Sequence, residues 1–362
     1  MVKMFGPQWH AAVMGTAIVA NGAHALPVHG PGLHAFAVGV WLLSFVLLAF
    51  VVAVRVAHVI VYWDEAKTQL LDNPSNAIFY GCPPMAMLAV GQGTLVLGPD
   101  VLGAHAAVTI DVVLWTIGAV YAVVVAFGIP YLMVTRWRME GGAVPGWLLP
   151  IVAPMVAAAL GPSLIPHLPP GQAQATMLYG CYALFGASLL GTLVLLPGIW
   201  SGLANGMLSP VTLTPTLFLV LGPLGQSTTA VVQLAKASAT AAPQYEKAME
   251  AFAILYGVPV MGFALLWLAL ALTANIRALR QSMPFAMTWW AYTFPVGTCV
   301  TGAAGLAGLT GLHVFTGLAV LLYALLLFAW VVVGSRTVRG AFTGELFYSP
   351  TLPSMSSRAA SR

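Results

Sequence analysis

Residues 215–229 read PTLFLVLGPLGQSTT, a run in which proline, glycine and polar side chains interrupt a membrane-length apolar segment. Four other apolar segments are broken in the same way, and the five centre on Met14, Met87, Pro154, Gly222 and Phe294. A broken helix in contact with lipid would leave backbone groups unsatisfied, which is costly in hydrocarbon. We therefore expect the five broken segments to be shielded by protein or to line a watery path.

Each broken segment is followed by a smoother apolar one, such as AVGVWLLSFVLLAFVVAV at 37–54. The five smooth partners cover 33–60, 104–135, 174–199, 248–276 and 309–335. A helix of about 20 apolar residues spans a bilayer. The pattern predicts an all-α integral membrane protein with ten transmembrane helices, in which the smooth helices surround the broken ones.

The composition agrees with a membrane protein. The chain is 60% hydrophobic and 6% charged, whereas soluble domains have about 25% charged residues. The apolar segments are too long, and lack the alternation, for a β-barrel. The net charge of +4 comes from helix ends and does not indicate a nucleic-acid partner. The three cysteines, Cys82, Cys181 and Cys299, have no paired spacing and are expected to be small buried residues.

The positive residues predict the orientation, because they concentrate on the cytoplasmic side of a membrane. Two of the thirteen, Lys236 and Lys247, are expected in the outer connection between the seventh and eighth segments. The other eleven lie at the N-terminus, after even-numbered segments, or in the tail: Lys3, Arg55, Lys67, Arg136, Arg138, Arg277, Arg280, Arg336, Arg339, Arg358 and Arg362. Both termini are therefore expected in the cytoplasm, and each broken–smooth pair is an outward-then-inward hairpin. Five parallel hairpins would form a quasi-five-fold ring around a central pore, in one domain over residues 1–339, with a short disordered cytoplasmic tail at 340–362.

Prolines in the broken segments predict irregular backbone near the membrane centre. Proline lacks an N–H group and displaces the carbonyl four residues earlier, so we expect kinks at Pro84, Pro154, Pro223 and Pro295. Helix ends near mid-membrane expose N–H groups with partial positive charge. No broken segment has an acidic or basic residue in its middle, and a cation path would be expected to contain a carboxylate. The sequence therefore favours an anion as the solute.

Polar side chains on the broken segments are candidates for lining the pore and binding the anion. They are Gln92, Thr94, Ser163, Gln226, Ser227, Thr229, Gln233 and Thr298. Three of them, Gln226, Thr229 and Gln233, share one helical face and either offer donors to an anion or bond to neighbouring helices. His10 is a possible pH sensor at the cytoplasmic mouth, or a histidine bonded at the interface with no role in transport. We find no nucleophile with its base and no metal-ligand cluster, so the sequence predicts neither an enzyme nor a cofactor.

The five broken segments also carry motifs of a known family. The motifs are PQWHAAVMGTAIVANG at 7–22, FYGCPPMAML at 79–88, WLLPIVAPMVAAALG at 147–161, GPLGQSTTA at 222–230 and WWAYTFPVGT at 289–298. Their order resembles the tellurite-resistance/dicarboxylate transporter family, which includes malic acid transporters, sulfite efflux pumps and plant slow anion channels. The resemblance runs from about Phe5 to Arg336. It implies ten helices in five hairpins, a pore in each protomer of a homotrimer, and a pore-occluding aromatic residue that maps onto Phe294.

These observations together predict an anion transporter or channel in the plasma or inner membrane, in contact with small anions and lipid. Organic dicarboxylates such as malate are the expected solutes. The alternative is an inorganic anion channel or a sulfite or tellurite exporter of the same family. A receptor or a structural assembly factor would differ from both by showing no anion flux in vesicles. For Phe294, the alternative to a gate is ordinary apolar packing.

Overall fold

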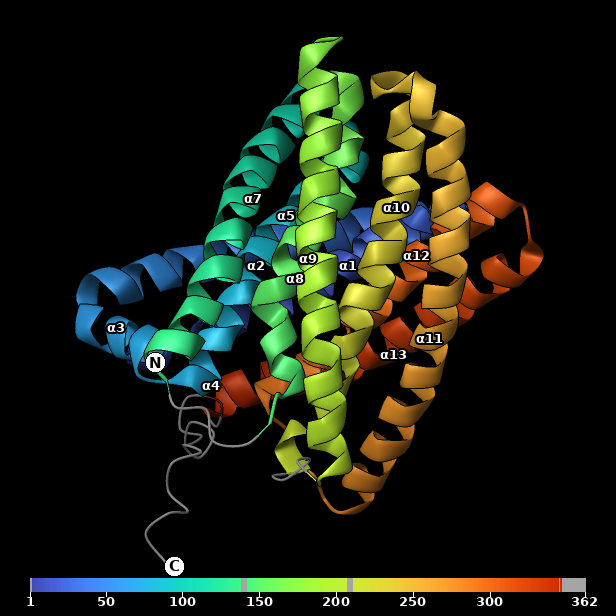
Figure 1. Cartoon of the computed structure of the whole chain (residues 1–362). Helices are drawn as coiled ribbons and strands as arrows, with labels where there is room; N and C mark the ends of the chain where they lie inside the picture. Colours follow the sequence, from blue (N-terminus) through green and yellow to red (C-terminus); the bar gives the residue numbers. More distant parts are fainter. Residues whose placement is uncertain (1, 138–141, 207–210, 345, 347–362) are drawn as a thin grey trace, which may run out of the picture.

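The computed structural model of this chain describes residues 2–137, 142–206, 211–344 and 346 (Figure 1). Most of the predicted tail, at 345 and 347–362, lies outside the described residues, as does Arg138. Within the described ranges the chain is helical and has no strand. The α-helices are α1 (His10–Ala25), α2 (Pro31–Val61), α3 (Trp63–Leu71), α4 (Pro74–Ala77), α5 (Cys82–Leu97), α6 (Pro99–Leu102), α7 (Ala104–Thr135), α8 (Leu148–Leu160), α9 (Gln172–Ala204), α10 (Leu221–Ala241), α11 (Glu246–Arg280), α12 (Phe294–Thr310) and α13 (His313–Thr343). The 3₁₀-helices are η1 (Val2–Met4), η2 (Pro7–Trp9), η3 (Ile78–Gly81), η4 (Pro145–Trp147), η5 (Gly161–His167), η6 (Val211–Val220), η7 (Pro243–Tyr245) and η8 (Met287–Tyr292).

Seven helical stretches of the described chain are long and apolar enough to cross a membrane. They are Pro31–Val61, Ala104–Thr135, Pro145–His167, Gln172–Ala204, Val211–Ala241, Pro243–Arg280 and His313–Thr343. The prediction of an all-helical membrane protein is therefore confirmed. The other three predicted segments contain α1, α5 and α12, whose continuous α-helices have only 16, 16 and 17 residues. Ten membrane crossings thus stay a prediction.

Proline explains why several inner helices are short. Pro84, Pro223 and Pro295 lie among the first three residues of α5, α10 and α12, where 3₁₀ turns give way to α-helix. A helix start tolerates proline because its first N–H groups have no acceptor within the helix. The expected mid-helix kinks at these three prolines are therefore helix starts instead. Only Pro154, of the four, lies inside an α-helix, α8.

Burial separates two kinds of helix. The most apolar part of Pro145–His167 is 83% buried, and that of Val211–Ala241 is 94% buried. In the five other long helical stretches, 22% to 33% of the corresponding residues are buried. Helices α1, α5 and α12 are also buried over most of their length. The broken segments therefore form the core of the protein, and the smooth helices expose large apolar faces that suit a lipid environment.

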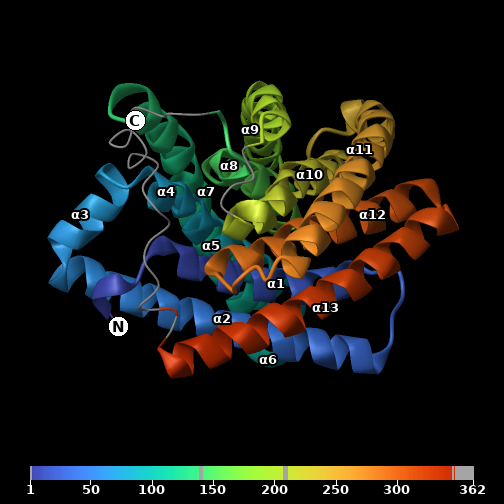
Figure 2. The same ribbon diagram turned by 90° about the horizontal axis from the view of Figure 1, so that it is seen from below.

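Each broken segment packs against the smooth helix that follows it, in the pairs α1–α2, α5–α7, α8–α9, α10–α11 and α12–α13. The inner helices also contact one another. Helix α1 contacts α5 and α12, α8 contacts α5 and α10, and α10 contacts α12. Figure 2 shows α9 and α11 standing outside α8 and α10. Helices far apart in sequence, such as α1 and α12, therefore meet in the core.

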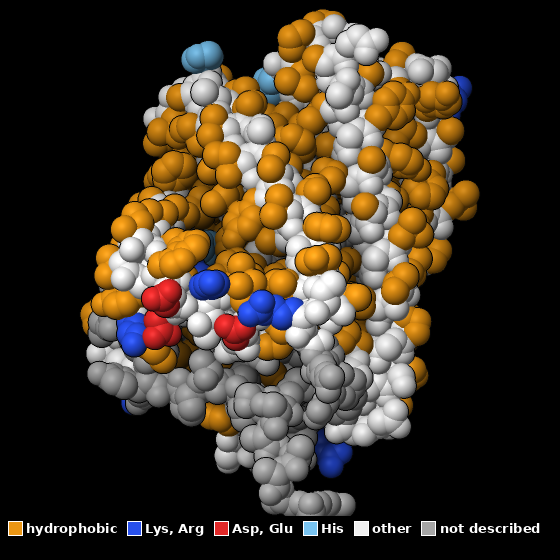
Figure 3. Space-filling view, turned by 60° about the vertical axis from the view of Figure 1, so that its left-hand side comes forward, with side chains coloured by type: hydrophobic (Ala, Val, Ile, Leu, Met, Phe, Trp, Pro, Cys, Tyr) orange, Lys and Arg blue, Asp and Glu red, His pale blue; other side chains and the backbone are white. Residues whose placement is uncertain are grey.

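Charged side chains gather at one end of the face shown in Figure 3, below a large hydrophobic surface. Two ion pairs join residues of α3 and its C-terminal end to other parts of the described chain. Lys3 Nζ is 2.9 Å from a Glu65 carboxylate oxygen, and Arg136 Nη2 is 2.8 Å from Asp72 Oδ1. The hydrogen bond to the Glu65 carboxylate raises the pKa of Lys3 above its ordinary value. The pairs tie the N-terminus and the end of α7 to the short helix α3 and the residue that follows it.

Helices α10 and α12 approach each other closely at Gly225. A Cβ atom at Gly225 would overlap the backbone of Thr298 and Cys299, whereas a Cβ atom at Gly222 would meet nothing within 4 Å. The Thr229 and Thr301 hydroxyls, 2.8 Å apart, bridge the same two helices. Because small residues let helix backbones pack tightly in membranes, Gly225 fixes the spacing of this pair.

We expect Gly225→Ala to lower the free energy of unfolding by about 1–3 kcal/mol, because the added methyl group must push α12 away. The check is thermal unfolding of the detergent-purified protein. Gly222→Ala is the matched control on the same helix, and it should be neutral or stabilising, since alanine is the better helix former. Equal melting temperatures for the two variants would contradict the close-packing argument.

Candidate functional site

A cavity of about 340 Å³ lies among the inner segments, with walls from α1, α5, α8, η5, α10 and α12. This volume falls in the range of about 300–1,000 Å³ that is typical of small-molecule sites. Its polar wall residues are Asn21, His24, Gln92, Ser163, Gln226, Thr229, Gln233, Lys236 and Thr301. Lys236 is exposed, so the cavity opens to the surface near the C-terminal part of α10. We call this space the polar cavity.

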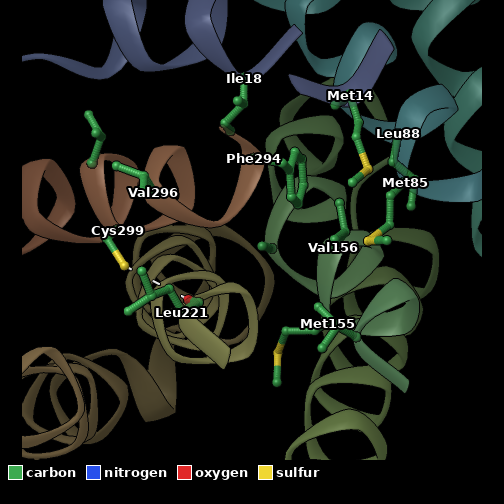
Figure 4. Packing of buried hydrophobic residues seen from close by; sticks show 14 of the residues in the cluster. Met14, Ile18, Met85, Leu88, Met155, Val156, Leu221, Phe294, Val296 and Cys299 are labelled. Carbon is green, nitrogen blue, oxygen red and sulfur yellow. Dashed lines mark hydrogen bonds between the residues drawn. The ribbon is translucent and has the colours of Figure 1, made fainter. Parts of the chain in front are cut away.

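Phe294 closes the opposite end of the polar cavity. Its side chain is 3% exposed and lines both this cavity and a second, much smaller one of about 20 Å³. The small cavity has an apolar wall that includes Met14, Met85 and Leu219. Figure 4 shows the Phe294 ring extending from α12 towards Val156 of α8, with Met14 of α1 close by. The ring therefore separates a polar compartment from an apolar one.

The structure brings together six of the predicted site residues. Phe294 and five of the eight predicted polar residues line the polar cavity, namely Gln92, Ser163, Gln226, Thr229 and Gln233. They come from four separate segments, α5, η5, α10 and α12, so the cavity gathers residues up to about two hundred positions apart in the chain.

The other three predicted polar residues lie outside the cavity wall and bond to protein. The Thr94 hydroxyl donates to the Val90 carbonyl oxygen at 2.9 Å and accepts from Trp41 Nε1 at 3.1 Å. The Ser227 hydroxyl donates to the Leu224 carbonyl oxygen at 3.1 Å. Thr298 donates to the carbonyl oxygen of Pro295 at 2.7 Å. All three are at most 1% exposed, so a solute in the cavity does not reach them.

The hydroxyls of Thr229 and Thr301 are also engaged. Thr229 Oγ1 lies 3.0 Å from the Gly225 carbonyl oxygen, and Thr301 Oγ1 lies 3.0 Å from that of Thr298. A hydroxyl has one proton to donate, so these two side chains turn lone pairs towards the cavity. Thr229 therefore bonds to the neighbouring helix α12, which is the alternative given above for the face of Gln226, Thr229 and Gln233. The side-chain amides of the glutamines carry free N–H groups in the cavity wall.

His10 lies apart from the cavities described here. It is 2% exposed, and its Nδ1 atom is 3.1 Å from the Pro7 carbonyl oxygen. The histidine that does line the polar cavity is His24, which belongs to the last turn of α1. The sequence analysis did not single out His24, which belongs to the same helix because α1 continues as far as Ala25.

Lys236 is a cavity-lining residue whose position the sequence predicted wrongly. It lies inside α10 and not in the connection to α11, because the helix continues to Ala241. It is also the sole Asp, Glu, Lys or Arg among the residues that line the polar cavity. A signal was present, since Gln226, Thr229, Gln233 and Lys236 continue one helical face with steps of three and four residues. One positive charge without a carboxylate makes the described wall attractive to anions.

Cysteine labelling tests which side chains line the cavity. Lys236→Cys and Gln233→Cys should react with a membrane-impermeant maleimide, because their side chains reach the open cavity. Thr94→Cys and Ser227→Cys should stay unlabelled in the folded protein. The native background should be low, since Cys82, Cys181 and Cys299 are buried as predicted. Labelling of Thr94→Cys at the rate of Lys236→Cys would contradict the assigned wall.

Comparison with known proteins gives the family. The family model described as SLAC1, voltage-dependent anion channel, matches residues 4–338. The sulfite efflux pump SSU1 of Arthroderma otae is 28% identical over 354 residues, which cover 96% of this chain and 93% of that protein. The SSU1 pump of Trichophyton rubrum is 28% identical over the same shares. An uncharacterized transporter of Methanocaldococcus jannaschii is 28% identical over 96% of both chains. The chain therefore belongs to the SLAC1 family of anion channels and transporters.

Proposed function

We propose that the protein passes small anions across a cell membrane through the polar cavity. One observation supports this most strongly: the described cavity wall has a single lysine, several amide groups and no carboxylate. A cation site within a membrane would be expected to hold acidic side chains or a ring of carbonyls. Membership of the family gives the same class of solute.

We further propose that the five inner segments form the wall of a central pore, with ten crossings arranged as five hairpins. The contacts α1–α5–α8–α10–α12–α1 support this arrangement, because they form a closed cycle. The charged cluster of Lys3, Glu65, Asp72 and Arg136 would then mark the cytoplasmic face, with both termini on that side. The polar cavity would open outward. A homotrimer of such protomers in the plasma or inner membrane stays a proposal that rests on the family resemblance.

Sulfite is the first candidate substrate. The relatives with the printed name sulfite efflux pump match 96% of this chain. Malate is the second candidate, because a cavity of about 340 Å³ offers room for a four-carbon dicarboxylate. In either case Lys236 would attract the anion at the open end. The amide N–H groups of Gln226 and Gln92 would then replace part of its water shell.

Phe294 is the proposed gate of the path. A ring that separates the polar cavity from a cavity of about 20 Å³ leaves no room for a hydrated anion. Transport therefore requires the ring to move. The neighbouring Met14 and Met85 side chains can adapt to that movement, because methionine is unbranched and flexible.

Flux into liposomes tests the function. Vesicles with the purified protein should take up sulfite, malate, nitrate or chloride, and should not take up potassium without an ionophore. Lys236→Gln should lower the anion flux at low salt by about tenfold, because it removes the steering charge. Lys247→Gln is the matched control, since Lys247 is exposed in the first turn of α11 and does not line the cavity. Absence of anion flux from correctly folded protein would contradict the proposal and favour a receptor or structural role.

Phe294→Ala tests the gate in the same vesicles. Removal of the ring should join the two cavities and raise the anion flux several-fold while the protein stays folded. Phe185→Ala is the control for lost packing, because Phe185 is 4% exposed on α9 and lines neither cavity. Unchanged flux in Phe294→Ala, or an equal rise in both variants, would assign Phe294 to packing.

A further inference from the structure

We infer that Gln92 and Gln226 select a hydrogen-oxyanion, meaning a monoanion that carries both a charged oxygen and an O–H group. Hydrogensulfite and the monoanion of a dicarboxylic acid belong to this class, whereas nitrate and chloride do not. The inference rests on the proposed function, because it names the protonation state of the anion that the polar cavity holds.

The observation behind it is a pair of unsatisfied amide oxygens. Gln92 on α5 and Gln226 on α10 both line the polar cavity and are 8% and 2% exposed. In each side chain the Oε1 atom is buried and has no hydrogen-bond partner among the described residues. Buried polar atoms are nearly always hydrogen-bonded, and an unpaired one indicates a missing partner. Two such atoms on residues that line one cavity indicate a solute that can donate a hydrogen bond to an amide once it turns towards the cavity.

The other unpaired oxygens of the described chain do not belong to this site. The amide of Asn21 also borders the cavity, but its Nδ2 atom donates to the Ala89 carbonyl oxygen at 2.9 Å and fixes its orientation. Its oxygen therefore packs beside Gly93 of α5. Gln8 and Thr192 have unpaired oxygens outside the cavity wall. Gln92 and Gln226 remain as the two amides that are free to turn towards a solute.

No other residue of the described wall donates to these two oxygens. Thr229 and Thr301 place their protons on backbone carbonyls or in the hydrogen bond between their own hydroxyls, so they add lone pairs and not O–H groups. A nitrate or chloride ion can accept from Lys236 and from the amide N–H groups, but it leaves both amide oxygens unpaired. A hydrogen-oxyanion can also accept from an N–H group through its charged oxygen, and its O–H donates to one of the two amide oxygens.

The test compares hydrogencarbonate with nitrate. Both are planar monoanions with three oxygens, and they differ by one O–H group. Binding is measured as the anion-dependent rise in melting temperature of the detergent-purified protein, at a pH where hydrogencarbonate is the main carbonate species. We expect the wild-type protein to bind hydrogencarbonate about tenfold more tightly than nitrate, as one added hydrogen bond to a buried acceptor would give.

Because hydrogencarbonate has one O–H group, the leucine variant that removes its acceptor, Gln92→Leu or Gln226→Leu, should bring the ratio of the two affinities close to one, and the double variant should do the same. Gln233→Leu is the matched control, because Gln233 lines the same cavity from α10 but has no buried unpaired oxygen. It should weaken both anions alike and keep the ratio. Equal wild-type binding of the two anions, or an unchanged ratio in both leucine variants, would overturn the inference and leave the proposed function intact. No binding of either anion would overturn the inference together with the assignment of the cavity to anions.

Discussion

Hydrocarbon offers no hydrogen bonds, and the rest of this fold depends on that constraint. The inner segments contain 3₁₀ turns and prolines, so some of their carbonyls lack the usual helical partner. Side chains of the outer helices supply it. Trp267 Nε1 donates to the Leu217 carbonyl oxygen at 2.9 Å, and Asn275 Nδ2 donates to that of Thr214 at 3.1 Å, both in η6. Ser188 donates in the same way to the Ile151 carbonyl oxygen, three residues before Pro154.

The smooth helices therefore do more than shield the core from lipid. They complete the hydrogen bonding of an irregular backbone that could not exist in contact with hydrocarbon. This division of roles explains why several polar residues of the outer helices face inward, as the indole of Trp41 does towards Thr94. It also leaves the inner segments free to place amides on a cavity wall.

The sequence predicted the apolar helices and the polar face of α10 well, because both depend on the local pattern of residues. Apolar length predicts a membrane span, and three- or four-residue spacing places Gln226 and Gln233 on one face. The errors came from tertiary packing and from helix ends. Nothing in the sequence shows that Thr94 and Thr298 bond inside the protein, because their partners are set by neighbouring helices. Lys236 was misplaced and His24 was overlooked, because charged and polar residues near helix ends look like loop residues.

The distribution of charge along the path has an electrical consequence. Lys236 is the one Asp, Glu, Lys or Arg in α1, α5, α8, α10 and α12, and it lies only five residues before the end of α10. A charge that crosses the whole membrane field gains about 2.3 kcal/mol per 100 mV, but a charge near one edge senses little of that field. The membrane potential would therefore act on an anion in the polar cavity more than on the charged side chain of the inner helices. Any rectification of the current would then report on which side of Phe294 the anion waits.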